Sequence, residues 1–151
     1  MKVCIAYDSK YGNGKKCVEY LHHILNMRGH SSEIGHIDEM HLLPEAEIYI
    51  FSSPTHMGSA TRKMKKFLKN INGKEGKEYA LITTCIDPKN PGTKTLTKME
   101  YILNKKYMRK VCNGIKIKVN GMKGPLEENY KKKIEDFYSL IFGLKNNNFL
   151  P

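Results

Sequence analysis

Residues 2–15 read KVCIAYDSKYGNGK and place an apolar segment directly before a glycine-containing turn. Residues 2–7 are rich in β-forming side chains and almost continuously apolar, which is typical of a strand buried on both faces of a parallel sheet. After the turn, apolar residues recur at helical spacing over residues 17–28, and a glycine follows where helices commonly end. This stretch therefore predicts a buried strand, a tight turn and a helix.

The same alternation continues along the rest of the chain. Further strands are expected at residues 32–37, 45–52, 79–84 and 115–119, and further helices at residues 64–71, 96–103 and 130–142. Strands that alternate with helices of this length favour a doubly wound α/β fold, with helices on both faces of a parallel sheet, over an α+β fold or a helical bundle. Residues 115–119 alternate apolar residues with lysine, so this strand is expected at an edge of the sheet.

The length of 151 residues, 40% of them apolar, is enough for one substantial core. We expect a single domain over residues 1–144 and a flexible tail over residues 145–151, which include three successive asparagines. No apolar run approaches the roughly 20 residues that span a bilayer, and no secretory signal is recognisable, so the protein is expected in the cytoplasm.

Cysteine and charge usage narrow the function classes. The four cysteines lack the paired spacing and the nearby histidines of a metal site, so reduced thiols and no metal are expected. The net charge is +11, but residues 1–60 carry 5 basic and 7 acidic side chains, whereas residues 61–151 carry 21 and 8. The excess of basic side chains in residues 61–151 either keeps helix surfaces solvated or forms a docking face for an acidic partner, an anionic substrate or nucleic acid.

In an open parallel sheet, ligands bind at the carboxyl ends of the strands, where the strand order reverses. Three loops are expected there, at residues 9–15, 53–59 and 83–92. The first loop precedes a helix whose free amides and positive dipole end attract phosphate, although many such turns bind nothing. Lys15 could add a positive charge. The loop has neither the glycine spacing of a Walker loop nor the three glycines of a dinucleotide-binding loop.

The first loop resembles the phosphate-binding loop of the flavodoxin family, which reads Ser/Thr, any residue, Thr/Tyr, Gly, any residue, Thr, and then opens a helix. Ser9, Tyr11, Gly12 and Asn13 match this pattern. Gly14 stands where the family usually has threonine, so one hydrogen bond to the phosphate would be missing, at a cost of about 1 kcal/mol in FMN affinity.

The second loop and its following helix are also similar to this family, in which the turn binds the isoalloxazine ring. The peptide before a glycine such as Gly58 can turn its carbonyl toward the flavin N5 in flavodoxins, and His56 and Met57 would flank the ring. The loop after the fourth strand would form a third wall. The resemblance implies FMN as cofactor and implies these binding residues: Ser9, Lys10, Tyr11, Gly12, Asn13, Gly14, Lys15, Pro54, Thr55, His56, Met57, Gly58, Thr84, Cys85 and Asp87.

The resemblance also implies a three-layer sandwich around a five-stranded parallel sheet of order 2-1-3-4-5. We consider three functions. The favoured one is a monomeric FMN-binding electron carrier with no catalytic side chains, whose redox partners present acidic docking surfaces. An alternative is an FMN-dependent oxidoreductase acting on a quinone or protoporphyrinogen-type substrate, because residues 83–92 contain no aromatic ring to cover the flavin. Cys85 could also act as a redox thiol.

The third possibility is a cofactor-free basic binding module. Lysines cluster at residues 63–69 and 131–133, but neither cluster interleaves the aromatic residues of a single-strand binder, so nucleic acid is an unlikely partner.

Overall fold

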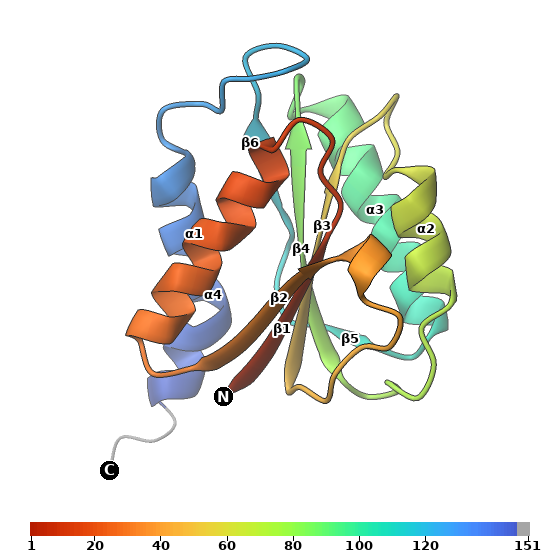
Figure 1. The fold of residues 1–151 in the computed structure, drawn as a ribbon, viewed down its shortest axis with the longest axis vertical. Coiled ribbons are helices and arrows are strands. Elements are labelled where there is room, and N and C mark those ends of the chain that lie inside the picture. The colour runs from red at the N-terminus through yellow and green to blue at the C-terminus, as the bar shows by residue number, and fades with distance from the viewer. Residues whose placement is uncertain (148–151) are drawn as a thin grey trace.

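Strands and helices alternate from the first residues onward (Figure 1). The computed structural model describes the backbone of residues 1–147 and the side chains of residues 1–143. The elements are β1 (Lys2–Tyr7), α1 (Asn13–Met27), β2 (Ser31–His36), the 3₁₀ turn η1 (Ile37–Glu39), β3 (Ile48–Pro54), α2 (Arg62–Lys69), β4 (Glu78–Cys85), α3 (Asn90–Lys105), β5 (Arg109–Lys110), β6 (Ile115–Lys118) and α4 (Tyr130–Asn147).

The strands form one parallel sheet in the order β2-β1-β3-β4-β5, with β6 also paired to β4. This confirms the expected order. The sixth strand is an addition: β5 pairs with the start of β4 and β6 with its end, so both lie along the same edge. Between them, a Cβ on Gly114 would lie 2.8 Å from Leu96 Cδ2 and 3.1 Å from the Leu81 carbonyl oxygen. The chain therefore passes too close to α3 and β4 for any larger residue to fit there without a shift.

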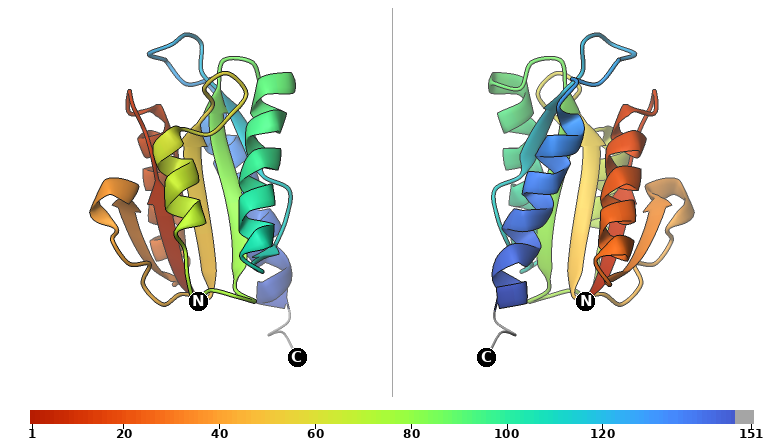
Figure 2. Two further views of the ribbon diagram at one scale, coloured as in Figure 1. Left: turned by 90° about the vertical axis from the view of Figure 1, so that its right-hand side faces the viewer. Right: turned by 90° about the vertical axis from the view of Figure 1, so that its left-hand side faces the viewer.

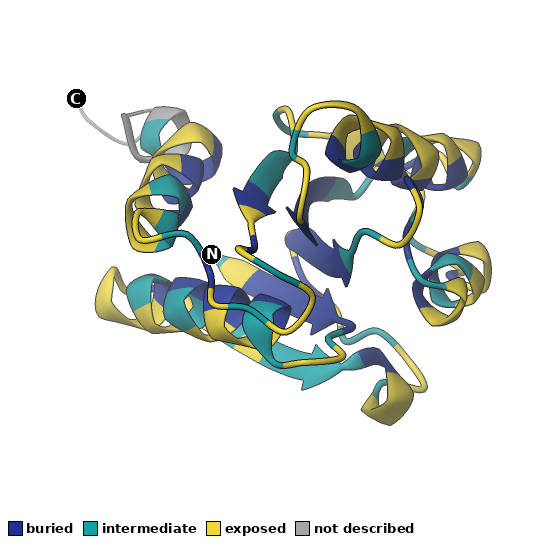
Figure 3. Ribbon diagram, turned by 90° about the horizontal axis from the view of Figure 1, so that it is seen from above, coloured by how far each residue is buried: buried dark blue, intermediate teal, exposed yellow. Residues whose placement is uncertain are grey.

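The sheet is covered on both faces, as a parallel sheet of apolar strands requires. Helices α1 and α4 lie on one face and α2 and α3 on the other (Figure 3). In β1, Val3, Ile5 and Tyr7 pack toward α1 and α4, whereas Cys4 and Ala6 pack toward α2 and α3. The continuous apolar run of β1 is thus divided between two cores by the alternation of a strand.

The element boundaries differ from the sequence expectation in several places. Strand β3 begins at Ile48 rather than at residue 45, and α3 begins at Asn90, inside the expected loop, with Pro91 in its first turn. Proline suits that position because its missing amide would have no helical partner. Helix α4 continues to Asn147, past the start of the expected tail, and residues 148–151 lie outside the described residues. Strand β5 is only two residues long, too short to produce a sequence pattern.

The carboxyl ends of β1, β3, β4 and β6 all lie at the same end of the sheet, at the top in Figure 1. Among the residues that the structure describes, no helix is both long enough and apolar enough to cross a membrane.

Candidate functional site

A cleft of about 270 Å³ opens at the carboxyl ends of the strands. It lies where the order of the strands reverses, between β1 and β3, which is where open α/β sheets bind ligands. Four loops line it, following β1, β3, β4 and β6. The lining residues are Ser9, Lys10, Tyr11, Asn13, Gly14, Pro54, Thr55, His56, Thr84, Cys85, Ile86, Val119, Gly121 and Met122.

The N-terminus of α1 forms one wall of this cleft. Gly12 has a left-handed backbone (φ 89°) that turns the chain into the helix, and no side chain caps it. The Lys15 amide donates to Ser9 Oγ (3.3 Å) and the Lys16 amide to the Gly12 carbonyl (3.0 Å). Within the described part of the chain, the amides of Asn13 and Gly14 have no acceptor. Two free amides at a positive helix end form a site suited to an anion.

A buried hydroxyl lies beneath the same helix turn. Ser52, in β3, is 1% exposed, and its Oγ has no hydrogen-bond partner among the described residues. A Cβ on Gly14 would lie 3.7 Å from this oxygen and 3.8 Å from Ser9 Oγ, which are ordinary contact distances. A Cβ at position 14 would therefore be accommodated, and would lie beside two hydroxyl groups.

The carboxylate of Asp8, which precedes the first loop, is buried and fully engaged. Its Oδ1 lies 3.1 Å from His36 Nε2 at the end of β2, and its Oδ2 accepts a hydrogen bond of 2.5 Å from Thr61 Oγ1. Thr61 in turn caps α2 by accepting from the Met64 amide. Asp8 thus fixes the end of β1 to β2 and α2, which holds the first loop in place.

The second loop is a tight turn at the mouth of the cleft. His56 and Ser59 exchange two backbone hydrogen bonds of 2.8 and 3.1 Å, and the residues between them, Met57 and Gly58, both have positive φ, at 52° and 73°. This is the pattern of a type I′ turn. A left-handed methionine costs roughly 1–2 kcal/mol, and the Met57 side chain is fully exposed, so neither propensity nor burial explains its presence. Strain of this kind clusters at functional sites.

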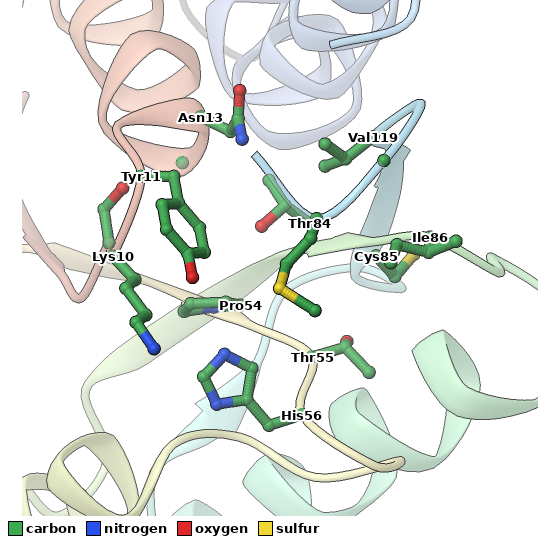
Figure 4. A pocket seen from close by; sticks show the side chains of 14 residues that line it. Lys10, Tyr11, Asn13, Pro54, Thr55, His56, Thr84, Cys85, Ile86 and Val119 are labelled. Carbon is green, nitrogen blue, oxygen red and sulfur yellow. The ribbon is translucent and has the colours of Figure 1, made fainter. Parts of the chain in front are cut away.

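Aromatic rings enter the cleft from the first two loops. In Figure 4, Pro54 lies between the Tyr11 and His56 rings, which point toward each other. The Lys10 ammonium lies 5.3 Å from the centroid of the Tyr11 ring. A planar ligand could therefore meet ring faces here, although residues 83–92 supply none.

The loops after β3 and β4 are joined directly. The Thr55 amide donates to the Thr84 carbonyl (2.8 Å), and the hydroxyls of Thr55 and Thr83 are 2.7 Å apart. Cys85, beside them, is 3% exposed, and burial raises the pKa of its thiol to about 11. The thiol is protonated at neutral pH, which argues against Cys85 as a redox nucleophile because the thiolate is the reactive form.

Ten of the expected site residues line the cleft, and five do not. The Lys15 ammonium lies 3.8 Å from the Glu19 carboxylate, on the outer side of α1. Asp87 accepts a hydrogen bond from the Lys89 amide (3.0 Å) and so shapes the entrance to α3. The others shape the two turns rather than line the cleft: Gly12, Met57 and Gly58.

Four lining residues were not expected from the sequence: Ile86, Val119, Gly121 and Met122. Three of them belong to the loop after β6. The signal was available, because a parallel strand expected at residues 115–119 must deliver its following loop to the same edge of the sheet. The side chains of Ile86 and Met122 are largely exposed, and with Tyr11 they give the cleft an exposed apolar rim.

Solved structures share this fold. Flavodoxin 2 of Bacillus cereus superposes with a TM-score of 0.77 at 21% identity, over 95% of this chain and 99% of that chain. The flavodoxin, WrbA-like protein from Agrobacterium tumefaciens superposes with a TM-score of 0.71 at 14% identity, over 97% of this chain and 98% of that chain. Rubredoxin oxygen:oxidoreductase from Desulfovibrio gigas superposes with a TM-score of 0.78 at 17% identity, over 99% of this chain but only 37% of that one. At these identities the likeness shows the fold alone.

No curated protein matches the sequence. The family described as "Flavodoxin domain" matches residues 4–119, from β1 through the end of the sheet. The match includes the first three cleft loops and most of the core. The chain therefore belongs to the flavodoxin family.

Proposed function

We propose that this protein binds FMN in the cleft and carries electrons between redox partners. The observation that carries the proposal is the pair of amides on Asn13 and Gly14, which have no acceptor among the described residues and belong to residues lining a cleft that aromatic rings also line. A ligand with an anionic group at one end and a flat ring at the other matches this combination. FMN has that form, and the family generally binds it.

The residues present fit both ends of FMN. The phosphate would accept hydrogen bonds from the Asn13 and Gly14 amides, with Ser9 beside them, and the flavin would lie between the loops that carry Tyr11 and His56. Ser52 supports the fit, because its buried and unpartnered hydroxyl lies beneath the phosphate position. When bound, FMN supplies the ring that accepts and releases electrons, and the chain supplies binding and orientation.

The cleft favours a carrier over an enzyme. Its volume of about 270 Å³ is near the lower end of the roughly 300–1,000 Å³ typical of ligand pockets, so it would hold part of FMN and leave little room for a substrate. Its exposed apolar rim suits transient contact with another protein. The protein carries a net charge of +11, so redox partners with acidic docking surfaces would be attracted to it.

An FMN-dependent oxidoreductase is the second candidate. Ile86 and Met122, both exposed beside the cleft, are apolar surfaces on which a quinone-like ring could rest. Steady turnover of a quinone with NADPH by the FMN-loaded protein alone would favour this candidate. Reduction that proceeds in two separate one-electron steps, without such turnover, would favour the carrier.

Titration with FMN and with riboflavin tests the proposal. Flavin fluorescence should be quenched at one FMN per chain, and FMN should bind at least about tenfold more tightly than riboflavin, because two charge-assisted hydrogen bonds are lost without the phosphate. Equal affinities would overturn the phosphate assignment. Absence of binding would overturn the cofactor.

A further inference from the structure

A second hollow is lined mainly by residues of α2 and α3, the two helices that face the viewer in Figure 2, left. It encloses about 580 Å³ and is called the α2–α3 groove below. Tyr101 and Ile102 form its floor. Lysines surround them: Lys65 and Lys69 from α2, Lys98 and Lys105 from α3, and Lys106 just after it. The groove and the cleft have no lining residue in common, so the two sites are separate.

The lysines of the groove lack ion-pair partners in the described part of the chain. None of the five lies within 4 Å of a carboxylate in the described part of the chain. Lysines just outside the groove behave differently, since Lys63 pairs with Asp38 at 2.9 Å and Lys110 with Glu100 at 3.4 Å. Lys65 and Lys69 are four residues apart on α2, which contains no acidic residue, and like charges at that spacing destabilise a helix. Lys69 and Lys105 lie in the last turns of α2 and α3, where positive charge stabilises a helix, but no carboxylate among the described residues offsets the repulsion within the set.

The floor of the groove is apolar and accessible. The Tyr101 side chain is 61% exposed, and the Lys105 ammonium lies 4.5 Å from the centroid of its ring. Ile102 is buried beneath it, and the methylene stems of the lysines extend the apolar surface while their charged ends reach water. An aromatic and aliphatic floor with a cationic rim is complementary to a segment that is apolar on one face and acidic at its edges.

We propose that the α2–α3 groove docks an acidic amphipathic segment of a partner protein. Apolar side chains of the segment would pack on Tyr101 and Ile102, and carboxylates on either side would pair with the lysines. A nucleic acid fits less well, because base stacking along a strand needs successive aromatic platforms and the groove offers one ring. The proposal goes beyond electron transfer and does not depend on whether FMN binds.

A designed peptide tests the groove directly. The probe is a fluorescein-labelled 15-residue helix with leucines at i, i+3, i+4 and i+7 and glutamates on either side of them. Two comparison ligands accompany it: a scrambled peptide of the same composition, and a single-stranded oligonucleotide. Binding is followed by fluorescence anisotropy, and the site is mapped by amide chemical shifts on the ¹⁵N-labelled full chain.

Charge reversal at the groove should weaken binding of the amphipathic peptide. For Lys69→Glu/Lys98→Glu we expect a loss of about tenfold or more, because two attractive contacts become repulsive. The matched control is Lys16→Glu/Lys131→Glu, which changes the net charge equally at two exposed positions on α1 and α4, and should lose less than about twofold. Tyr101→Ala leaves the charge unchanged and should also weaken binding, which separates packing from attraction by net charge.

The outcomes divide cleanly. Shifts confined to α2 and α3, with selective loss in the groove variants, support the proposal. Equal binding of the scrambled peptide, equal loss in both charge-reversed variants, tighter binding of the oligonucleotide at the groove, or no peptide binding would each overturn it. Binding of FMN is read separately by flavin fluorescence, so failure of one proposal leaves the other intact.

Discussion

Gly14 is where the chain departs from the phosphate-binding loop of its family, and the structure shows that the departure is not forced. The backbone there is not left-handed, and a Cβ would make contacts of 3.6–3.8 Å. A threonine at this position would add a hydroxyl beside Ser9 and Ser52 at the edge of the proposed phosphate site. At the proposed phosphate site, the glycine would therefore remove one ligand without a compensating gain in backbone geometry.

We expect Gly14→Thr to tighten FMN binding by about 1 kcal/mol, or roughly fivefold, through one added hydrogen bond. Fluorescence titration of the variant against the parent protein measures this. An unchanged or weaker affinity would show that position 14 does not face the phosphate.

Gly12→Ala is the control for that substitution. Nothing lies within 4 Å of a Cβ at Gly12, but its φ of 89° is one that only glycine adopts cheaply. The alanine should cost about 1 kcal/mol or more in unfolding free energy and should weaken FMN binding by disturbing the turn. A gain in affinity from both substitutions would point to general stiffening of the loop rather than to a specific ligand.

The sequence could predict most lining residues but not their orientation. Parallel strands end at one edge, so Ser9, Pro54 and Thr84 had to lie near one another. The direction of Tyr11 and His56, and the use of Asp87 to accept the Lys89 amide, depend on loop geometry that no spacing pattern records. The same argument applies to the loop that carries Met122, because it follows the parallel strand β6. That loop was not expected at the cleft because β6 lies at the lateral edge of the sheet.

Among the secondary-structure elements, the long periodic ones were predictable and the short ones were not. Helix α1 has clear periodicity and buries one face, whereas strands β1 and β4 are nearly continuous buried runs. Strand β5 and the break before β6 arise from tertiary contact, since Gly114 is where Leu96 and β4 approach the chain. Local sequence cannot report a constraint that comes from another element.

His30 connects the end of α1 to α4 and is expected to make stability depend on pH. It follows α1, its Nε2 lies 3.0 Å from the Tyr138 hydroxyl of α4, and its ring lies 4.6 Å from that of Phe142. Burial lowers the pKa of His30 below its ordinary value of 6.5. As pH falls, His30 therefore binds its proton at a higher pH in the unfolded chain than in the folded one. This proton binding lowers the unfolding free energy.

We expect the unfolding free energy contributed by His30 to be complete above about pH 6.5 and to be lost as pH falls from there toward the lowered native pKa. His30→Gln removes the titration and keeps a hydrogen-bonding group for Tyr138. Denaturant unfolding of both proteins between about pH 5 and pH 8 should show a flatter profile for the variant. Parallel profiles would mean that His30 does not titrate differently in the folded chain.

For the domain as a whole, the net charge of +11 should act on the bound cofactor and on its partners. Reduction adds negative charge to a flavin, and a positively charged protein stabilises that charge over several ångströms. Salt screens this effect, with a Debye length of about 10 Å at 0.1 M.

We expect the midpoint potential of the FMN-loaded protein to become more negative as salt is raised from about 50 to about 500 mM. Spectroelectrochemical titration measures this, and riboflavin free in solution is the control. A potential that rises with salt would indicate that negative charge near the cleft outweighs the lysines.

The most direct measurement follows the backbone amides of the ¹⁵N-labelled protein during titration with FMN. The amides of Asn13 and Gly14 should show the largest downfield shifts, saturating at one FMN per chain, and inorganic phosphate should shift the same two signals in the same direction. Shifts centred elsewhere, or none at these two residues, would contradict the proposed phosphate site at the start of α1.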